Sequence, residues 1–341
     1  MLVSRRFLVS LGISILFLTI FAFHIDIGQV AYSIRQADYY LLIPALIVYF
    51  TTVLFRVVRW KYLLAPIKSI PVRTMYPIVV MGYMANNILP IRLGEVVRAH
   101  YIGEKEGISK TAALTSIVVE RVFDALTLLL FISIASMFLP TMDIIQGLGA
   151  ISGIPPLILA SLMSAPFVFT AIIMILFSRS PERLDRIITF LRIIMPSTLK
   201  SGTENAVRSI SQGLSILRTP KNIIVLLALS VPIWIFEAMM YYIIGFSFDL
   251  NTFFNPAQMW IVILLVTAIA NLATAIPAAG GGIGTFDVAA SATLTILSVD
   301  PSVAGAYTIV LHLALLVPIT VLGLIYQFLY SLPLRKIGKS I

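Results

Sequence analysis

Long apolar runs are the feature that most constrains what this chain can fold into. Each is about as long as the roughly 20 residues that a helix needs to cross a bilayer. The runs cover residues 7–23, 39–58, 111–139, 154–177, 222–246 and 303–330. The mean hydropathy is +1.01 and 11% of the residues are charged, about half the charged share of a soluble domain. The sequence therefore predicts an all-α polytopic membrane protein without a separate soluble catalytic domain.

Basic residues are concentrated in loops on one side of the predicted membrane. The net charge is +9. With the N-terminus inside, the inner loops hold Arg5, Arg6, Arg56, Arg59, Lys61, Lys68, Arg73, the basic residues of 179–221, and Arg335, Lys336 and Lys339. The positive-inside rule then places both termini in the cytoplasm and the chain in the cytoplasmic membrane. Basicity here indicates orientation and anionic lipid, so we expect no nucleic-acid partner.

The residue types that usually hold metals are scarce. The chain has no cysteine, and its three histidines are His24, His100 and His312. Thiolate metal sites, iron–sulfur clusters and thiol nucleophiles are therefore excluded. We expect no metal and no cofactor.

The stretch 76–98 contains the first of two interruptions in the apolar pattern. Asn86 and Asn87 precede Pro90 and Gly94, so the segment breaks before it can cross. Proline lacks the N–H that continues a helix, and glycine adopts backbone conformations that other residues avoid. The freed backbone groups cannot face lipid and must line a polar cavity or be buried in protein. The sequence predicts a re-entrant hairpin here, with an interfacial loop under the bundle as the alternative.

The stretch 257–298 contains the second interruption. It follows Asn271, and its breaking residues are Pro277, Gly280, Gly281, Gly282 and Gly284, shortly before Asp287. Bare N–H groups at the start of a helix form a concavity that suits a phosphate, although the lysine and strand of a nucleotide-binding loop are missing. The alternative is close helix packing through small residues. The chain then has six full spans and two re-entrant hairpins, or eight spans if 257–277 and 285–298 each cross.

Charged residues stand in the middle of two predicted spans. Glu120, Arg121 and Asp124 interrupt the span 111–139, and Glu237 interrupts the span 222–246. Each charge near the bilayer centre costs roughly 2.5–3.5 kcal/mol on insertion scales, so these groups must pair internally or line a wet path. Helical spacing puts Glu120, Arg121 and Asp124 in one sector. We expect Glu237 to pair with Arg92, Arg98 or Arg121; a static ion-pair cluster that holds helices together is the alternative to a transport path.

The two interruptions resemble each other in order and spacing. Each runs asparagine, proline, glycine and acid, and a helix of small residues follows. Ser109 precedes Arg121 by the same interval of twelve residues by which Asp300 precedes His312. Because the first unit enters from inside and the second from outside, the sequence predicts an inverted repeat.

The repeat divides the chain, which we treat as one membrane domain over 1–341. We predict a first half at 1–178, a cytoplasmic amphipathic connector at 179–221 and a second half at 222–341. In the connector, apolar residues recur at helical spacing opposite arginines, which is typical of a helix on a membrane surface or of a cytosolic connector.

The interruptions and the buried charges together resemble a known family. The residues that carry the likeness are Asn87, Pro90, Arg92, Gly94, Glu95, Arg98, Glu120, Arg121, Asp124, Glu237 and the segment 277–287. Over nearly the whole chain this pattern is similar to the flippase-like integral membrane domain of lysylphosphatidylglycerol synthases. The resemblance implies a stand-alone member, without the lysyl-transferring domain, that moves lipids with anionic, phosphate or glycosylated heads, including polyprenyl-phosphate-linked sugars. The family often has glutamate near the position of Asp287.

These observations together predict a lipid flippase that works by alternating access. Guanidinium groups and bare backbone N–H groups suit a phosphate head, and the predicted head-group ligands are Arg92, Arg98, Arg121, Gly280, Gly281, Gly282 and Gly284. The predicted charge partners or proton-coupling groups are Glu95, Glu120, Asp124, Glu237 and Asp287. Asn86, Asn87, Asn271 and His312 are the predicted polar lining, and Pro90, Gly94 and Pro277 are the predicted helix breaks.

Two other classes of function stay open at this point. The first is an ion- or proton-coupled transporter of small solutes. The second is an intramembrane lipid-modifying enzyme, in which Glu95, Glu120 and Asp124 would act with His100 or His312, but the catalytic set is incomplete. We therefore predict a transporter rather than an enzyme, with membrane lipids as partners and with a second copy or an enzyme of lipid or glycan synthesis as an associated chain.

Overall fold

A computed structural model describes residues 5–89, 93–139, 146, 153, 155–179, 197–276 and 278–330. All regular elements in this part of the chain are helical, which confirms the predicted all-α fold. The longer helices are α1 (Arg5–Phe23), α2 (Ile27–Gln36), α3 (Leu42–Leu64), α4 (Val72–Ile88), α5 (Gly94–Glu106), α6 (Lys110–Ala135), α8 (Pro156–Arg179), α10 (Ser197–Gly213), α11 (Pro220–Ser247), α12 (Pro256–Ala273), α13 (Thr285–Ile296) and α14 (Pro301–Tyr330). Short 3₁₀ turns are η1 (Tyr39–Leu41), η2 (Ser215–Arg218), η3 (Leu250–Thr252) and η4 (Gly280–Gly282).

Four helical segments within the described residues are long and apolar enough to cross a membrane. They are Tyr39–Leu64, Pro220–Ser247, Pro256–Ala273 and Pro301–Tyr330. The pair α1 and α2 would add a fifth span, although it is bent by 85° between Phe23 and Ile27. In α6, which is 26 residues long, Glu120, Arg121 and Asp124 interrupt the apolar run that the sequence marked as a span.

Capping residues fix where several helices begin and end. The Oγ atom of Ser109 accepts a hydrogen bond from the N–H of Ala112 and caps α6. Asn255 and Gln258 cap each other's backbone N–H groups before Pro256, the first residue of α12, an arrangement that satisfies two otherwise unpaired donors. The left-handed Gly107 (φ +68°) ends α5, as glycine commonly does after a helix.

Helices α3 and α11 pack against each other in antiparallel fashion. Tyr62, near the end of α3, donates a hydrogen bond to Asn222 at the start of α11. Arg56, which comes earlier in α3, pairs with Glu237, which comes later in α11. The two helices therefore end at opposite faces of the molecule, so α4 and α12, which follow them, start from opposite faces.

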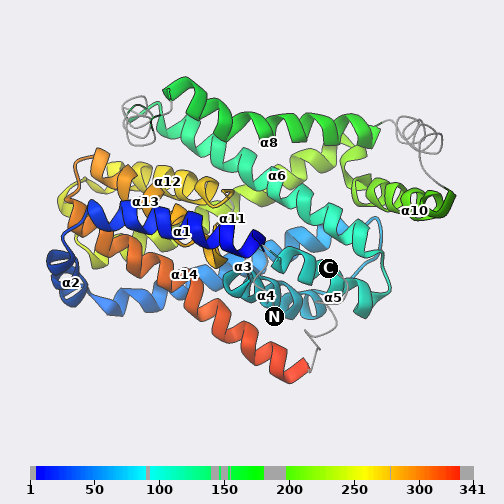
Figure 1. The fold of residues 1–341 in the computed structure, drawn as a ribbon, viewed down its shortest axis with the longest axis horizontal. Coiled ribbons are helices and arrows are strands. Elements are labelled where there is room, and N and C mark those ends of the chain that lie inside the picture. Colours follow the sequence, from blue (N-terminus) through cyan, green and yellow to red (C-terminus); the bar gives the residue numbers. More distant parts are fainter. Residues whose placement is uncertain are drawn as a thin grey trace.

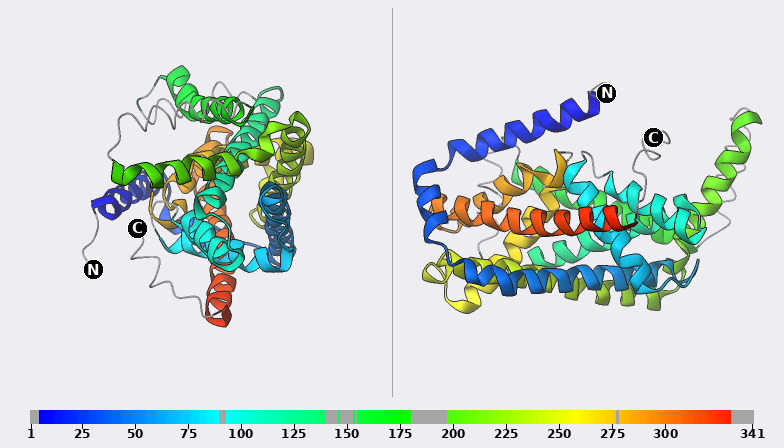
Figure 2. Two further views of the ribbon diagram at one scale, coloured as in Figure 1. Left: turned by 90° about the vertical axis from the view of Figure 1, so that its right-hand side faces the viewer. Right: turned by 90° about the horizontal axis from the view of Figure 1, so that it is seen from below.

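The helices after α3 and α11 form two similar units (Figures 1 and 2). The first unit is α4, a break, α5 and α6; the second unit is α12, a break that contains η4, α13 and α14. Within each unit the short middle helix packs on both neighbours, and across the units α4 packs on α14 while α12 packs on α6. Because this pattern maps onto itself when the units are exchanged, the fold has the inverted order that the sequence predicts.

The remaining helices surround this core. Figure 1 shows α8 lying along α6, and α1 lies beside α13, which it also contacts. Helix α2 packs on α14, and α10 packs on α6. Of the predicted amphipathic connector, Val207 and Leu214 are buried, so this part is a helix docked on protein; the connector residues 180–196 lie outside the described residues.

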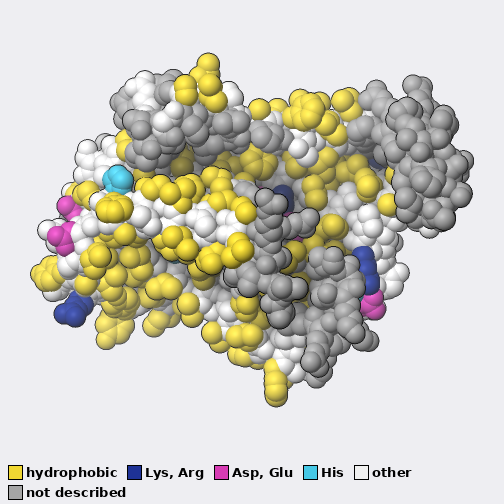
Figure 3. Space-filling model, viewed as in Figure 1, with side chains coloured by type: hydrophobic (Ala, Val, Ile, Leu, Met, Phe, Trp, Pro, Cys, Tyr) yellow, Lys and Arg dark blue, Asp and Glu magenta, His cyan; other side chains and the backbone are white. Residues whose placement is uncertain are grey.

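The surface of the bundle is largely apolar, as a lipid-facing surface requires (Figure 3). Leu324 and Ile325 of α14 and Ile43 and Ile47 of α3 are exposed. Near the middle of the face in Figure 3, a small area of basic and acidic side chains interrupts the apolar surface.

One part of the predicted orientation is wrong in detail. The charge pattern predicts an inner loop at Arg56 and Arg59, yet both lie within α3, which continues to Leu64, and both are buried. Their charges are neutralised inside the bundle by acids of other helices, so they do not contribute to the positive-inside bias.

Candidate functional site

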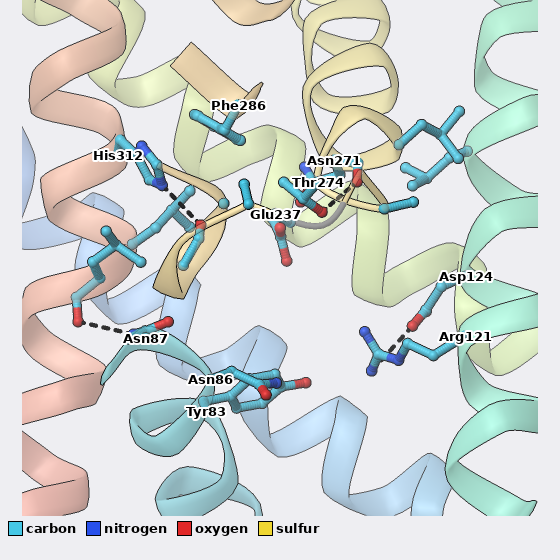
Figure 4. A pocket seen from close by; sticks show the side chains of 18 of the residues that line it. Tyr83, Asn86, Asn87, Arg121, Asp124, Glu237, Asn271, Thr274, Phe286 and His312 are labelled. Carbon is cyan, nitrogen blue, oxygen red and sulfur yellow. Dashed lines mark hydrogen bonds and ion pairs between the residues drawn. The ribbon is translucent and has the colours of Figure 1, made fainter. Parts of the chain in front are cut away.

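A cavity of about 280 Å³, lined by charged and polar side chains together with apolar ones, lies where the two breaks meet. Its wall combines polar residues of both units with residues of α3, α8 and α11 (Figure 4). The predicted site residues that line it are Asn86, Asn87, Glu95, Arg121, Asp124, Glu237, Asn271, Gly280, Gly281, Gly282 and His312. Tyr49, Arg56, Tyr83 and Trp234 also line it, and the sequence did not indicate them.

The two breaks are in direct contact at this cavity. A Cβ atom added to Gly280 would overlap the carbonyl oxygen of Asn87 at the end of α4. Asn87 in turn donates its side-chain N–H to Leu316 O (3.3 Å) and to Thr320 Oγ1 (2.9 Å) of α14. Gly281 has φ +74°, a conformation that L side chains avoid. Glycine is therefore required here both by the close approach and by the turn.

Arg121 reaches into the cavity from the middle of α6. Its Nη2 lies 3.4 Å from Asp124 Oδ2, and its Nε lies 3.6 Å from Glu95 Oε1. Charge-assisted hydrogen bonds are usually about 2.7–2.9 Å long, so both ion pairs are loose. The side chain is 25% exposed. Figure 4 shows the guanidinium extending from α6 into the space between Asp124 and Tyr83.

Asp124 is the hub of the charges beside the cavity. Its Oδ1 accepts hydrogen bonds from Arg59 Nη1 (2.7 Å) and from the indole N–H of Trp234 (3.0 Å). Its Oδ2 lies within ion-pair distance of Arg121 and of Arg56 Nη1 (3.7 Å). One carboxylate therefore connects three arginines from two helices.

Glu237 pairs with an arginine that the sequence analysis did not consider. Its Oε2 lies 2.6 Å from Arg56 Nη2, so the predicted partners Arg98 and Arg121 are wrong, while Arg92 lies outside the described residues. The Arg56 guanidinium also lies over the Trp234 ring, 4.7 Å from its centroid, which adds a cation–π attraction. Nothing in the local sequence distinguishes Arg56 from a loop arginine, because only the pairing of α3 with α11 brings an acid to it.

A second group of charges lies behind the cavity wall and does not line it. Arg98 Nη2 lies 2.9 Å from Glu120 Oε2, and Arg59 Nη2 lies 3.6 Å from Glu120 Oε1. Glu120 is 1% exposed, and the Arg98 guanidinium lies 4.2 Å from the centroid of the Trp60 ring. This buried network ties α3, α5 and α6 together, so Arg98 and Glu120 hold helices in place rather than face a guest molecule.

The second unit carries a pair at the position of Arg121 and Glu95. Nδ1 of His312 lies 2.8 Å from Asp287 Oδ1, and Nε2 of His312 lies 3.1 Å from the carbonyl oxygen of Gly281. Asp287 Oδ2 accepts the N–H of Gly284 (2.8 Å) at the start of α13. His312 faces the cavity, whereas Asp287 and Gly284 lie behind it.

Several buried polar atoms around the cavity have no hydrogen-bond partner among the described residues. They are Tyr83 Oη, Asn86 Oδ1, Arg121 Nε and Asp124 Oδ2. Native structures rarely leave buried polar atoms unpaired, and these four belong to cavity-lining residues of α4 and α6.

Three predicted residues, Pro90, Arg92 and Pro277, lie outside the described residues. Gly94, the remaining predicted break residue, begins α5 and packs so closely on Gly82 and Asn86 that a Cβ atom would clash with them. Within the described part of the chain, no group of three His, Cys, Asp or Glu side chains could hold a metal ion.

The fold and the site define a class: a polytopic membrane protein in which two broken-helix units enclose a charged cavity. The sequence model of the family described as the lysylphosphatidylglycerol synthase transmembrane region matches residues 7–323 of this chain. The chain therefore belongs to that family, as the sequence motifs predict, and a membrane role related to lipids follows from this membership.

Named relatives match most of the chain. A UPF0104 membrane protein of Methanothermobacter thermautotrophicus is 22% identical over 314 residues, which cover 89% of this chain and 87% of the relative. A UPF0104 membrane protein of Methanocaldococcus jannaschii is 25% identical over 295 residues, which cover 83% of this chain and 81% of the relative. Both are similar to this chain along nearly its whole length.

Proposed function

We propose that this protein moves a lipid with a phosphate-containing head, either an anionic phospholipid or a polyprenyl-phosphate-linked lipid, across the cytoplasmic membrane. The head would cross through the cavity between the two breaks while the acyl or prenyl tail stays in the bilayer. Both termini would lie in the cytoplasm, and the two units would rock against each other to alternate access.

The observation that carries this proposal is the length of the two ion pairs that Arg121 makes in the cavity. Arg56 and Arg59 each make an ion pair of 2.6–2.7 Å, whereas both acids beside Arg121 stand at 3.4 Å or more. A phosphate offers two oxygens to the guanidinium fork in the geometry that it prefers. Arg121 can therefore exchange loose carboxylate partners for a phosphate, and Glu95 and Asp124 neutralise it again when the lipid leaves.

The apolar part of the cavity wall supports a lipid over a free solute. Leu128, Phe167 and Ile276 line the cavity beside the charged groups, and Ile276 is 42% exposed. An apolar stretch of wall would let a tail remain in hydrocarbon while the head is inside. A carrier of free solutes would need a closed polar wall instead.

The test is reconstitution in vesicles with a panel of fluorescent phospholipids and fluorescent polyprenyl-phosphate sugars. Movement is measured as the fraction of label that becomes accessible to a membrane-impermeant quencher. We expect wild-type protein to move at least one lipid of the panel, and Arg121→Gln to reduce its initial rate by at least about tenfold, because the bidentate phosphate contact is worth more than about 1.4 kcal/mol. Arg121→Lys should keep part of the rate.

Lys110→Gln is the matched control. Lys110 forms an ion pair with Glu104 at the surface, so its replacement removes a positive charge without touching the cavity, and the rate should not change. The proposal fails if Arg121→Gln moves every lipid at the wild-type rate. Chemical conversion of the labelled lipid by purified protein would instead indicate an intramembrane enzyme.

A further inference from the structure

The surroundings of His312 require more protons than a neutral imidazole carries. Nε2 faces the carbonyl oxygen of Gly281 at 3.1 Å, and this oxygen can only accept a hydrogen bond. Nδ1 faces Asp287 Oδ1 at 2.8 Å. A neutral imidazole has one N–H, so with an ionised Asp287 one of these contacts would bring two acceptors together. Both contacts are satisfied only when the pair holds one additional proton, which is shared between Nδ1 and Oδ1.

Other contacts of the pair are consistent with that extra proton. Asp287 Oδ2 already accepts the N–H of Gly284 at 2.8 Å, so the second oxygen of this carboxyl group has its own partner and Oδ1 is the atom that faces His312. The Phe286 ring lies 4.4 Å from the His312 ring, between centroids, and an aromatic face attracts a cation.

The segment that His312 contacts is a part of the cavity wall at which the two breaks meet. Gly281 belongs to η4, and Gly280 of the same turn contacts the backbone of Asn87 at the first break. Release of the proton leaves a neutral imidazole beside a carboxylate, and one contact of the ring must then be lost. If the carbonyl contact is lost, η4 loses its hydrogen bond to α14 and keeps the packing of Gly281 on Leu316, so the junction between the two units is weakened.

We propose that His312 and Asp287 form a proton-binding site whose occupancy holds the glycine turn 280–282 against α14, and that this proton is the coupling ion for lipid movement. The second half of this statement rests on the proposed function above. Proton release to the cavity would open the junction between the breaks, and proton uptake would close it again. A pH gradient across the membrane would then drive the lipid toward one leaflet.

The neighbouring elements bring other titratable and charged groups to this cavity. They are Tyr49 and Arg56 of α3, Tyr83 of α4, Glu95 of α5, Arg121 and Asp124 of α6, and Glu237 of α11. Behind the wall, Tyr241 of α11 accepts a hydrogen bond from Asn271, and Tyr307 of α14 donates one to the carbonyl oxygen of Tyr241. Arg56, Glu237, Arg121 and Asp124 are ion-paired with one another or with Arg59, and Arg121 also with Glu95. Helix α2 packs on the start of α14, and its Arg35 is exposed. Each carboxylate of this set thus lies beside an arginine, whereas Asp287 faces His312.

The first test observes the proton itself and does not need transport. Protein with ¹⁵N-labelled histidine in nanodiscs gives signals from three residues, and His312→Gln identifies the signal of His312. We expect this ring to carry protons on both nitrogens at neutral pH, and Asp287→Asn to remove that form. A ring that carries one proton from about pH 5 to about pH 9 in the wild type would overturn the proposal.

The second test applies a pH gradient to the lipid-loaded vesicles described above. Wild-type protein should drive the labelled lipid beyond an equal distribution between leaflets, and a protonophore should abolish this asymmetry. His312→Gln and Asp287→Asn should abolish the response of the lipid distribution to the gradient, whereas Glu104→Gln, at a surface ion pair, should keep it. The two variants are complementary. His312→Gln removes the titratable ring but keeps a hydrogen-bond donor for Asp287, whereas Asp287→Asn keeps the ring and removes the carboxylate.

The outcomes separate the two proposals. Lipid movement by the wild type that ignores the gradient overturns proton coupling and leaves the flippase function intact. Absence of lipid movement in every arm overturns both the function and the coupling, and in that case the histidine spectrum still decides whether the proton site exists.

Discussion

The two broken-helix units have the same order of helices but different charge chemistry. At equivalent positions, the first unit pairs Arg121 with Glu95 and the second pairs His312 with Asp287. Behind Arg121 lies a network of buried charges, including Arg98 and Glu120. Behind His312 lie aromatic rings, with Phe286 between it and Tyr241.

This difference suggests a division of roles between the units. A guanidinium keeps its charge at every physiological pH, whereas an imidazole changes charge near neutrality. The first unit therefore offers a permanent positive charge for a phosphate, and the second offers a charge that a proton can switch. A symmetric pair of arginines could bind a head group but could not couple its movement to protons.

The largest effect that would sharpen the comparison is expected from Glu120→Gln in the first unit. The change leaves Arg59 and Arg98, both buried, without one carboxylate partner. Breaking a buried ion pair in this way costs about 3–5 kcal/mol, and we expect a clear fall in the thermal unfolding temperature in detergent. Glu104→Gln removes a surface pair, worth about 0–1 kcal/mol, and serves as the control. Equal melting of the two variants would show that the network is not structural.

A second experiment makes the first unit resemble the second. Arg121→His puts a titratable group at the phosphate position, and imidazole is charged only below a pKa of about 6.5. The rate of lipid movement should therefore fall as pH rises, by about thirtyfold between pH ~5.5 and ~8, whereas Arg121→Lys should show no such fall. If Arg121→His and Arg121→Lys have the same pH profile, the charge of residue 121 does not control the rate.

The smallest of these effects concerns the contact between the units. Gly280→Ala places a methyl group against the Asn87 carbonyl oxygen. Overpacking of this kind costs about 1–3 kcal/mol, so thermal stability should fall and the cavity should be distorted. Gly12 of α1 has open space around it, and Gly12→Ala should be neutral or slightly stabilising. A neutral Gly280→Ala would contradict the close contact of the two breaks.

Much of the fold could be predicted from local sequence features. Apolar runs gave the helices, and the glycine turn from Gly280 to Gly282 falls inside the predicted second break. The interval from Ser109 to Arg121 predicted a counterpart at His312, and both side chains line one cavity. These features depend on hydropathy, helix-breaking residues and helical spacing, which act over short stretches of chain.

The partners of the charges could not be predicted in the same way. Arg56 and Arg59 have the sequence signature of an inner loop, and only the helix that continues to Leu64 shows them as buried. Arg98 was expected to bind a head group, but the packing of α5 on α6 places it beside Glu120. A side chain's charge is visible in the sequence, whereas its distance from another charge depends on which helices meet.

The sequence by itself determined that this is an integral membrane protein. It also determined the positions at which the helices break and the span that carries Glu120, Arg121 and Asp124. Hydrophobicity and backbone geometry are properties of consecutive residues, so they need no knowledge of the fold. Only the tertiary structure decided that Arg121 has loose partners, that Arg56 neutralises Glu237, and that His312 touches the glycine turn. Electrostatic attraction depends on separation in space, and residues far apart in the chain are brought to that separation only by the packing of one unit against the other.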